Sequence, residues 1–176
     1  MSLFEQLNRE AAAQGLRFLV IGGHAVIEYG FQRGTEDADV LVSKTDRAAW
    51  TNTISRLGYK LIRDGRTFLQ FESSDPSQWD LDLMMVPVDV FERLLASARP
   101  AMLEGAAVVV PSLEHLLALK IHAMKNGTGL RVLKDTTDVA QLLSANRIDP
   151  NSVWLRTLFE KHADMKLYER VVRLLT

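Results

Sequence analysis

A short apolar segment that ends at two glycines and precedes two alternating aspartates constrains the fold more than any other feature of the sequence. Residues 16–21 are mostly apolar and bounded by glycines, which predicts a buried strand. Gly22 and Gly23 interrupt it, and a short helix is expected at residues 24–29. A second strand is expected at residues 37–42. Strands and helices therefore alternate in this part of the chain.

The elements around this segment predict a mixed sheet with helices. Ser2 and Glu5 have the spacing of a capping box, which predicts a first helix that ends near Gly15. Later patterns predict a helix at 44–57, a hairpin of strands at 59–62 and 67–72, a strand at 79–86, a helix at 88–96 and a strand at 106–110.

The rest of the chain is expected to be helical. Helices are predicted at residues 111–126 and 131–144 and beyond Pro150. We therefore expect an α/β (α+β) fold, with a small mixed β-sheet flanked by helices in residues 1–111. A C-terminal helical region in residues 112–176 is expected to pack on that core.

The balance of charges argues against binding of nucleic acid or membranes through an overall electrostatic field. Lysine and arginine contribute 21 residues and aspartate and glutamate 22, so any recognition of phosphate must be local. The absence of cysteine excludes a disulfide framework, a thiolate metal site and a cysteine nucleophile. The charged N-terminal residues do not fit a signal peptide, and no apolar run is long enough to span a membrane. We expect a soluble cytoplasmic protein with no membrane partner.

Two pairs of aspartates are the candidate metal ligands. Because side chains alternate faces along a strand, Asp37 and Asp39 project from the same face, roughly 7 Å apart, and Asp80 and Asp82 do the same. Like charges on one face are unfavourable unless a cation or protonation offsets their repulsion. Carboxylate oxygens favour Mg²⁺ or Mn²⁺. The alternative is that these aspartates only line the solvated face of a sheet.

The two glycines make the metal interpretation more specific. Gly22 and Gly23 at a turn from strand to helix let backbone amides approach a phosphate closely. His24 follows them and could contact a substrate, although packing on the short helix is the simpler interpretation. The glycine turn and the aspartates together predict a site for a metal ion and a phosphate group.

The segment GGHAVIEYGFQRGTEDADVLV resembles the core motif of the polymerase β-type nucleotidyltransferase superfamily. The order of Arg33, Thr35, Asp37 and Asp39 is most similar to the minimal and AbiEii-like toxin branches. The resemblance implies that Asp37 and Asp39 hold the metal ions of a nucleoside triphosphate. It also implies a third carboxylate in WDLDLMMVP, for which Asp82 fits the pattern and Asp80 is the alternative.

Further nucleotide contacts are implied by the same resemblance. PSLEHLLALKIHA and LKDTTDVAQLL resemble two downstream helices of the branch, which suggests Lys120 and Asp135 as nucleotide-binding residues. Lys120 lies in an apolar stripe and needs a partner, so an ion pair with Asp135 is the structural alternative. The remaining nucleotide-binding candidates are Gly22, Gly23, Arg33 and Thr35. The alternative to a phosphate-binding role for Arg33 is a solvated position in a loop.

The hypothesis for function is a metal-dependent nucleotidyltransferase. The enzyme would move a nucleoside monophosphate from a nucleoside triphosphate, with ATP as one candidate, to a hydroxyl of an RNA, a protein or a small molecule, and Asp82 would activate that hydroxyl. The resembling branch also implies a toxin with an antitoxin partner. One alternative is a catalytically inactive module that acts by binding a partner protein. Another is a glycosyltransferase, whose nucleotide-binding domain needs a longer chain.

Overall fold

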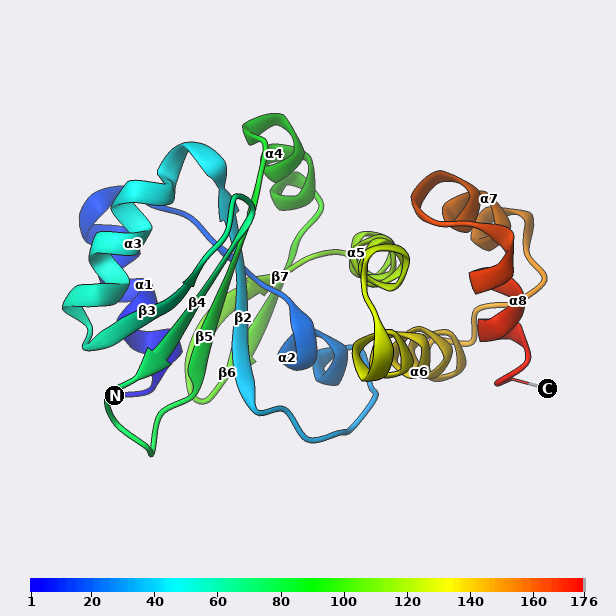
Figure 1. The fold of residues 1–176 in the computed structure, drawn as a ribbon, viewed down its shortest axis with the longest axis horizontal. Helices are drawn as coiled ribbons and strands as arrows, with labels where there is room; N and C mark the ends of the chain where they lie inside the picture. The colour runs from blue at the N-terminus through cyan, green and yellow to red at the C-terminus, as the bar shows by residue number, and fades with distance from the viewer. Residues whose placement is uncertain (176) are drawn as a thin grey trace. The chain divides into compact units, whose positions relative to one another are not determined.

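The computed structural model describes residues 1–175, which form two compact units (Figure 1). The first unit contains Met1–Ala25 and Arg33–Ser112, and the second contains Val26–Gln32 and the described residues from Leu113 onward. Helix α2 (Gly22–Glu28) therefore begins in the first unit and ends in the second.

A five-stranded mixed sheet forms the centre of the first unit. Its strands follow the order β1 (Leu19–Val20), β2 (Asp37–Ser43), β5 (Asp80–Val86), β4 (Phe68–Ser73) and β3 (Tyr59–Asp64). Strands β2 and β5 are parallel, whereas the other neighbours are antiparallel. This mixed sheet with its helices confirms the predicted fold class, and the predicted hairpin is that of β3 and β4.

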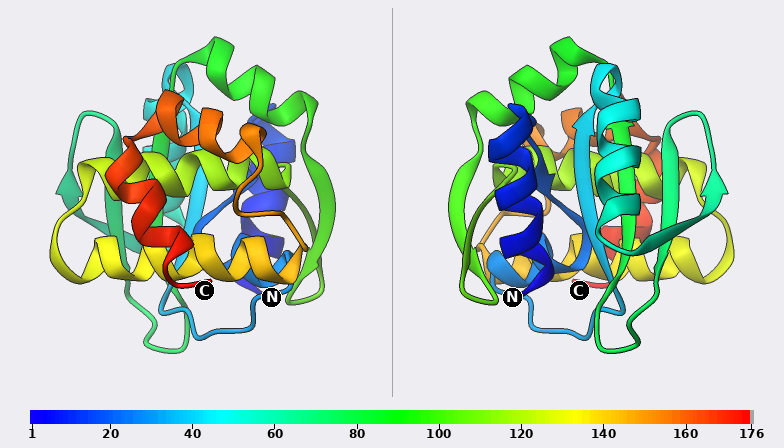
Figure 2. Two further views of the ribbon diagram at one scale, coloured as in Figure 1. Left: turned by 90° about the vertical axis from the view of Figure 1, so that its right-hand side faces the viewer. Right: turned by 90° about the vertical axis from the view of Figure 1, so that its left-hand side faces the viewer.

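Helices α1 (Leu3–Gln14) and α3 (Arg47–Arg56) cover one face of this sheet (Figure 2). The predicted capping box is present at the start of α1, where Ser2 and Glu5 each bond the other's backbone amide. On β5, Leu81, Leu83 and Met85 are buried, while the alternate residues are half-exposed or exposed. The sheet thus has one face in the core and a second face that carries the polar side chains.

The strand before the glycines and the helix after β2 differ from the sequence prediction, whereas α4 matches it. The strand expected at residues 16–21 is limited to Leu19–Val20, because β1 pairs with β2 through only two residues. The helix expected at 44–57 begins with a 3-10 turn, η1 (Lys44–Asp46), before α3. Helix α4 (Val88–Ala96) has the predicted bounds.

A strand that the sequence does not predict forms a separate two-stranded sheet. Strand β6 (Arg99–Leu103) pairs antiparallel with β7 (Ala106–Val110). Because β6 begins with an arginine and a proline and exposes Pro100 and Met102, it lacks a buried apolar run that would mark it. Only pairing with β7 defines it as a strand.

The second unit is built from helices, as predicted. Its helices are α5 (Leu113–Asn126), α6 (Gly129–Ala145), α7 (Val153–His162) and α8 (Met165–Val172). Residues 26–32 join them through Asn146, whose Nδ2 donates a hydrogen bond to the carbonyl of Tyr29 at 2.9 Å. No helix within residues 1–175 combines the length and the apolar character needed to cross a membrane.

Candidate active site

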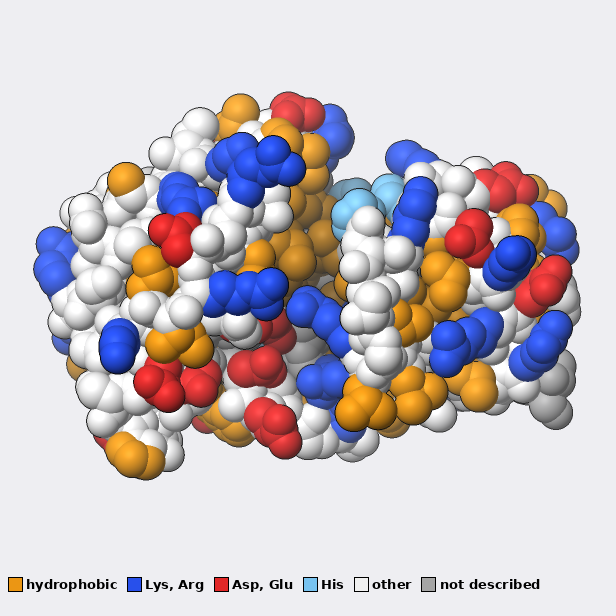
Figure 3. Space-filling model, viewed as in Figure 1, with side chains coloured by type: hydrophobic (Ala, Val, Ile, Leu, Met, Phe, Trp, Pro, Cys, Tyr) orange, Lys and Arg blue, Asp and Glu red, His pale blue; other side chains and the backbone are white. Residues whose placement is uncertain are grey.

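The register of β2 and β5 brings the two aspartate pairs together. Asp37 lies opposite Asp80 and Asp39 lies opposite Asp82, so all four residues share one face of the sheet. Ligand oxygens of Asp37, Asp39 and Asp82 all lie within 4.8 Å of one another, and the three residues are half-exposed. Figure 3 shows acidic side chains gathered over the part of the first unit where β2 lies. Three converging carboxylates are a ligand set for a hard divalent cation.

The geometry distinguishes the two candidates for the third carboxylate. Asp82 belongs to the group of three, whereas Asp80 does not. Asp80 Oδ1 instead accepts a hydrogen bond from the backbone amide of Ser73 at 2.9 Å, and the residue is exposed. The structure therefore favours Asp82 as the third ligand and gives Asp80 a contact that supports the β4–β5 connection.

The two glycines leave space for the side chains of the site. Gly22 has a φ of +61°, and a Cβ built on it would lie 1.7 Å from Asp39 Oδ2. A Cβ on Gly23 would lie 2.5 Å from Thr35 Oγ1. Any side chain at these positions would displace Asp39 or Thr35. The glycine turn is thus required for the position of a candidate metal ligand, and its predicted contact with phosphate remains a prediction.

The loop before β2 is fixed by two hydrogen bonds of predicted site residues. Thr35 Oγ1 donates to the carbonyl of Asp37 at 3.1 Å, and Arg33 Nη1 donates to the carbonyl of Gly34 at 2.7 Å. Both side chains lie against Gly23. Arg33 and Thr35 therefore belong to the immediate surroundings of the carboxylates, where the sequence expects them, and their binding of nucleotide remains a prediction.

Gln70 is a residue of the site that the sequence reasoning missed. It lies on β4 directly opposite Asp82, and its Nε2 donates a hydrogen bond to Asp82 Oδ1 at 3.2 Å. A lone glutamine in a strand has no motif that marks it. The only signal that could have found it is the register between β4 and β5.

His24 packs in the core of the first unit. Its ring makes edge contacts with Phe4 and Trp79, and only 7% of the residue is exposed. Burial lowers the pKa of His24 below its usual value, against a smaller opposing effect of nearby carboxylates. The imidazole is therefore neutral at pH 7, which supports the packing interpretation.

Lys120 and Asp135 meet within the second unit. Lys120 Nζ lies 2.8 Å from Asp135 Oδ1 and 2.7 Å from Asp138 Oδ2, and all three side chains are buried. Burial lowers the pKa of Lys120, but the two carboxylates raise it more, so the net pKa shift is upward. The ion pair considered from the sequence is present, with Asp138 as an additional partner. The assignment of Lys120 and Asp135 to nucleotide binding stays a prediction.

Comparison of the whole sequence with known protein families identifies the family of the chain. Residues 6–174 match the family of the nucleotidyl transferase AbiEii toxin of a type IV toxin–antitoxin system. The chain belongs to this AbiEii family. It is therefore a nucleotidyltransferase of a toxin family, which confirms the resemblance seen in the sequence. No curated protein sequence matches the chain.

Solved structures show the same fold as this AbiEii family member. ANT(2″)-Ia, in complex with adenylyl-2″-tobramycin, has a TM-score of 0.64 and 16% identity, with 90% of this chain and 95% of that chain covered. An antigenic nucleotidyltransferase-like protein from Paracoccidioides brasiliensis has a TM-score of 0.56 and 17% identity, with 96% and 90% covered. The lincomycin-bound lincosamide antibiotic adenylyltransferase LnuA has a TM-score of 0.56 and 15% identity, with 82% and 98% covered. At these identities the likeness establishes the fold.

Proposed function

We propose that this AbiEii family member uses Asp37, Asp39 and Asp82 to hold Mg²⁺ or Mn²⁺ while it transfers a nucleoside monophosphate from a nucleoside triphosphate to a hydroxyl group. Pyrophosphate is the leaving group. The observation that carries the proposal is the convergence of three carboxylates within 4.8 Å on one sheet face. Their all-oxygen donor set fits a hard divalent cation and disfavours a soft metal. When bound, such a cation neutralises phosphate charge and stabilises the attacking and leaving oxygens.

The order of the strands supports a division of roles among the carboxylates. The glycine turn follows β1, and the strands then run β1, β2, β5, β4 across the sheet. Asp39 on β2 thus lies beside Gly22, whereas Asp82 lies one strand farther from the turn. We assign the triphosphate to the side of the glycine turn, with Arg33 as a phosphate ligand. We assign the acceptor hydroxyl to the side of Asp82, which accepts its proton.

The structural contacts support different roles for the other predicted nucleotide-binding residues, Thr35, Lys120 and Asp135. The contact of Thr35 with the backbone of Asp37 supports a role in shaping the loop that presents Asp37. The proposal includes Lys120 and Asp135 because the family resemblance implies them. Their mutual ion pair, shared with Asp138, supports a structural role for the same residues. Substitution of Lys120 separates the two roles, as described in the Discussion.

Family membership also suggests the classes of acceptor and the partner protein of this enzyme. Toxin-family membership favours a cellular acceptor, which is an RNA end, a protein hydroxyl or a small molecule. It also favours an antitoxin partner that counteracts the activity. Two of the similar solved structures contain an antibiotic or its adenylyl derivative: ANT(2″)-Ia is in complex with adenylyl-2″-tobramycin, and LnuA is bound to lincomycin. Testing all three classes of acceptor in one assay decides among them.

The test is incubation of the purified protein with each α-labelled nucleoside triphosphate and Mg²⁺, with total RNA or cell lysate as acceptor. We expect label in one acceptor class and no label after addition of EDTA. The variant Asp37→Asn with Asp39→Asn is expected to transfer no label above background. Asp89→Asn is the matched control, because Asp89 is an exposed carboxylate of the same unit that pairs with Arg93. A double variant that transfers label at the parent rate would contradict the proposal.

A further inference from the structure

One transverse row of side chains connects the candidate metal ligands to a neutral amide. Strand register places Asp39 of β2 opposite Asp82 of β5, and Asp82 opposite Gln70 of β4. Residues directly opposite each other in neighbouring strands share a face, so their side chains are adjacent. The row therefore runs from the glycine turn through two carboxylates to Gln70.

The hydrogen bond within this row joins the amide to the third carboxylate. Gln70 Nε2 donates to Asp82 Oδ1 at 3.2 Å, and both residues are half-exposed. A neutral amide donates to a carboxylate without neutralising its charge. A lysine or arginine in the same place would compete with a metal cation, and a glutamate would add a fourth negative charge. An amide is thus the donor that holds Asp82 and leaves its charge available.

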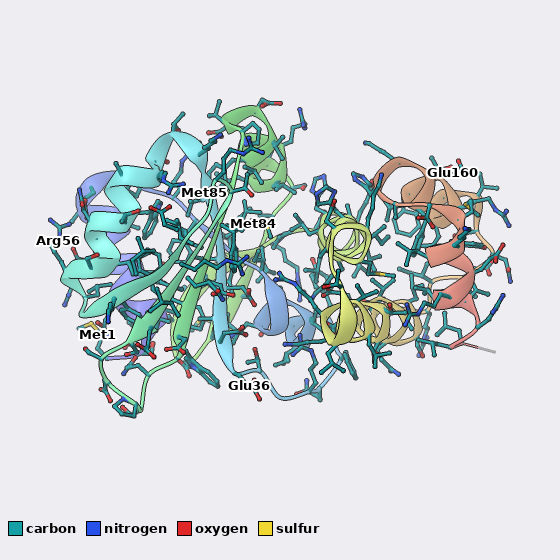
Figure 4. All side chains as sticks on the ribbon, viewed as in Figure 1. Met1, Glu36, Arg56, Met84, Met85 and Glu160 are labelled. Carbon is teal, nitrogen blue, oxygen red and sulfur yellow. The ribbon has the colours of Figure 1, made fainter. Side chains whose placement is uncertain are left out.

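The next row on this face shields the contact on one side. Met84 of β5, labelled in Figure 4, lies opposite Phe68 of β4. Both residues are half-exposed. Gln70 and Asp82 are therefore flanked along their strands by apolar side chains on the same face. An apolar flank limits competition from water, so the hydrogen bond constrains the carboxylate more than it would on an open surface.

We propose that Gln70 is a positioning residue, which holds Asp82 Oδ1 so that the carboxylate faces the metal cation and the acceptor hydroxyl. This inference rests on the proposed function. Groups that orient a metal ligand through a hydrogen bond typically contribute 10-fold to 100-fold to metal affinity or activity. Because Gln70 contacts the ligand on the acceptor side, its loss is expected to lower kcat and metal affinity and to leave the KM for nucleotide unchanged.

The experiment measures Mn²⁺ binding to the full chain by electron paramagnetic resonance, without nucleotide, alongside steady-state kinetics. Gln70→Leu removes the donor and is expected to weaken Mn²⁺ binding about 10-fold or more and to lower kcat by a similar factor. Gln70→Met keeps the length of the side chain and serves as the second variant if the leucine variant folds poorly. It is expected to show the same loss.

Gln14→Leu is the matched control. Gln14 Nε2 donates to Thr53 Oγ1 at 2.8 Å, which makes it a glutamine donor in the same unit with a partner outside the carboxylate group. This control is expected to lower the stability of the protein and to leave Mn²⁺ affinity and kcat within about twofold of the parent. Equal losses of Mn²⁺ affinity in the Gln14 and Gln70 variants would overturn the inference, because they would show a general loss of stability.

The outcomes separate this inference from the proposed function. A parent protein that transfers nucleotide, together with a Gln70→Leu variant of unchanged kcat and Mn²⁺ affinity, overturns only the role of Gln70. A parent that binds Mn²⁺ without transferring nucleotide overturns the proposed function, and the Mn²⁺ affinities still decide the role of Gln70. A parent that binds no Mn²⁺ overturns the role of Gln70, and the transfer assay still decides the proposed function.

Discussion

The two units each contain a cluster of three charged side chains, and the clusters are built in opposite ways. In the first unit, Asp37, Asp39 and Asp82 bring three charges of one sign together on a half-exposed sheet face. In the second unit, a buried lysine lies between two buried aspartates. The second cluster pairs a lysine with its aspartates, whereas we propose that the first cluster binds an external cation.

The difference predicts that the first cluster serves binding and that the second serves stability. Like charges close together disfavour the folded state, so the carboxylate group is kept at some cost in stability. A buried lysine with two carboxylates depends on each partner, because removal of one leaves charge buried without compensation. Substitutions in the first cluster should therefore abolish activity and preserve the fold. Substitutions in the second should first lower the free energy of unfolding.

The largest expected effect is on activity in the first cluster. Asp39→Asn removes the charge of one proposed metal ligand, and metal ions contribute several kcal/mol to catalysis, so the rate of transfer should fall by about 10³-fold or more. The free energy of unfolding should stay the same or rise, because like-charge repulsion is reduced. Transfer assays and urea unfolding measure the two quantities. A variant that is active, or that unfolds several kcal/mol more easily, would break the contrast between the clusters.

The second cluster should show the reverse order of effects. Lys120→Met leaves two aspartates buried together and is expected to lower the free energy of unfolding by about 3–5 kcal/mol, or the melting temperature by about 10 °C. Adding Asp135→Asn and Asp138→Asn should restore most of that stability. Calorimetry and urea unfolding measure it. If the Lys120→Met variant melts at the same temperature as the parent, the proposed structural role of Lys120 is wrong.

The restored triple variant also sharpens the functional assignment of Lys120. If its transfer rate returns with its stability, then Lys120 acts through the fold alone. If the variant is stable but its KM for nucleotide is raised, then Lys120 and Asp135 also bind the nucleotide, as the resemblance implies. The KM and the fraction of folded protein must therefore be measured together.

A smaller effect is expected at the glycine turn. Gly22→Ala places a Cβ 1.7 Å from Asp39 Oδ2 at a positive φ, so Asp39 must move. We expect a loss of stability of about 1–3 kcal/mol and at least a 10-fold loss in Mn²⁺ affinity. Gly15→Ala is the matched control, with a φ of +64° and nothing within 4 Å of its Cβ. Gly15→Ala should lower stability through backbone strain and leave Mn²⁺ affinity unchanged. An equal loss of Mn²⁺ affinity in the Gly15 and Gly22 variants would refute the steric explanation.

The smallest expected effect is a pH dependence of stability in the first unit. The pKa of His24 is lowered by burial, so the unfolded chain takes up a proton near pH 6.5 that the folded chain does not. The contribution of neutral His24 to stability is therefore complete above pH 6.5 and is lost as the pH falls below it. One proton changes the free energy of unfolding by at most about 1.4 kcal/mol per pH unit. His24→Phe keeps an aromatic ring and should flatten the profile between pH 7 and 5.

His162 allows the same experiment in the second unit. Its pKa is also lowered, by burial and then by the positive charges of Lys161, His122 and His115. His162→Gln should therefore remove a separate part of the same pH dependence. Urea unfolding at several pH values distinguishes the two histidines. If His24→Phe retains the slope of the parent, burial of His24 does not affect stability in this range.

The sequence determined the features that depend on neighbouring residues along the chain. The capping box of Ser2 and Glu5 sets the start of α1 through bonds that span three residues. The two-residue period of a strand places Asp37 and Asp39 on one face wherever the strand pairs. The two glycines mark the change from β1 to α2, where Gly22 adopts a positive φ, and apolar spacing marks the helices of the second unit.

Only the tertiary structure decided which distant residues meet these local features. The parallel register of β2 and β5 brings Asp82 opposite Asp39, and of the two aspartates on β5 only Asp82 joins the group of three carboxylates. The register of β4 brings Gln70 to Asp82. Packing of α5 and α6 adds Asp138 to the predicted pair of Lys120 and Asp135. A shift in register by one residue leaves every local pattern unchanged but turns each side chain to the other face. Register depends on packing across the whole sheet. For this reason the sequence favoured Asp82 over Asp80 only through the family resemblance, and it could not identify Gln70 as the hydrogen-bond donor to Asp82.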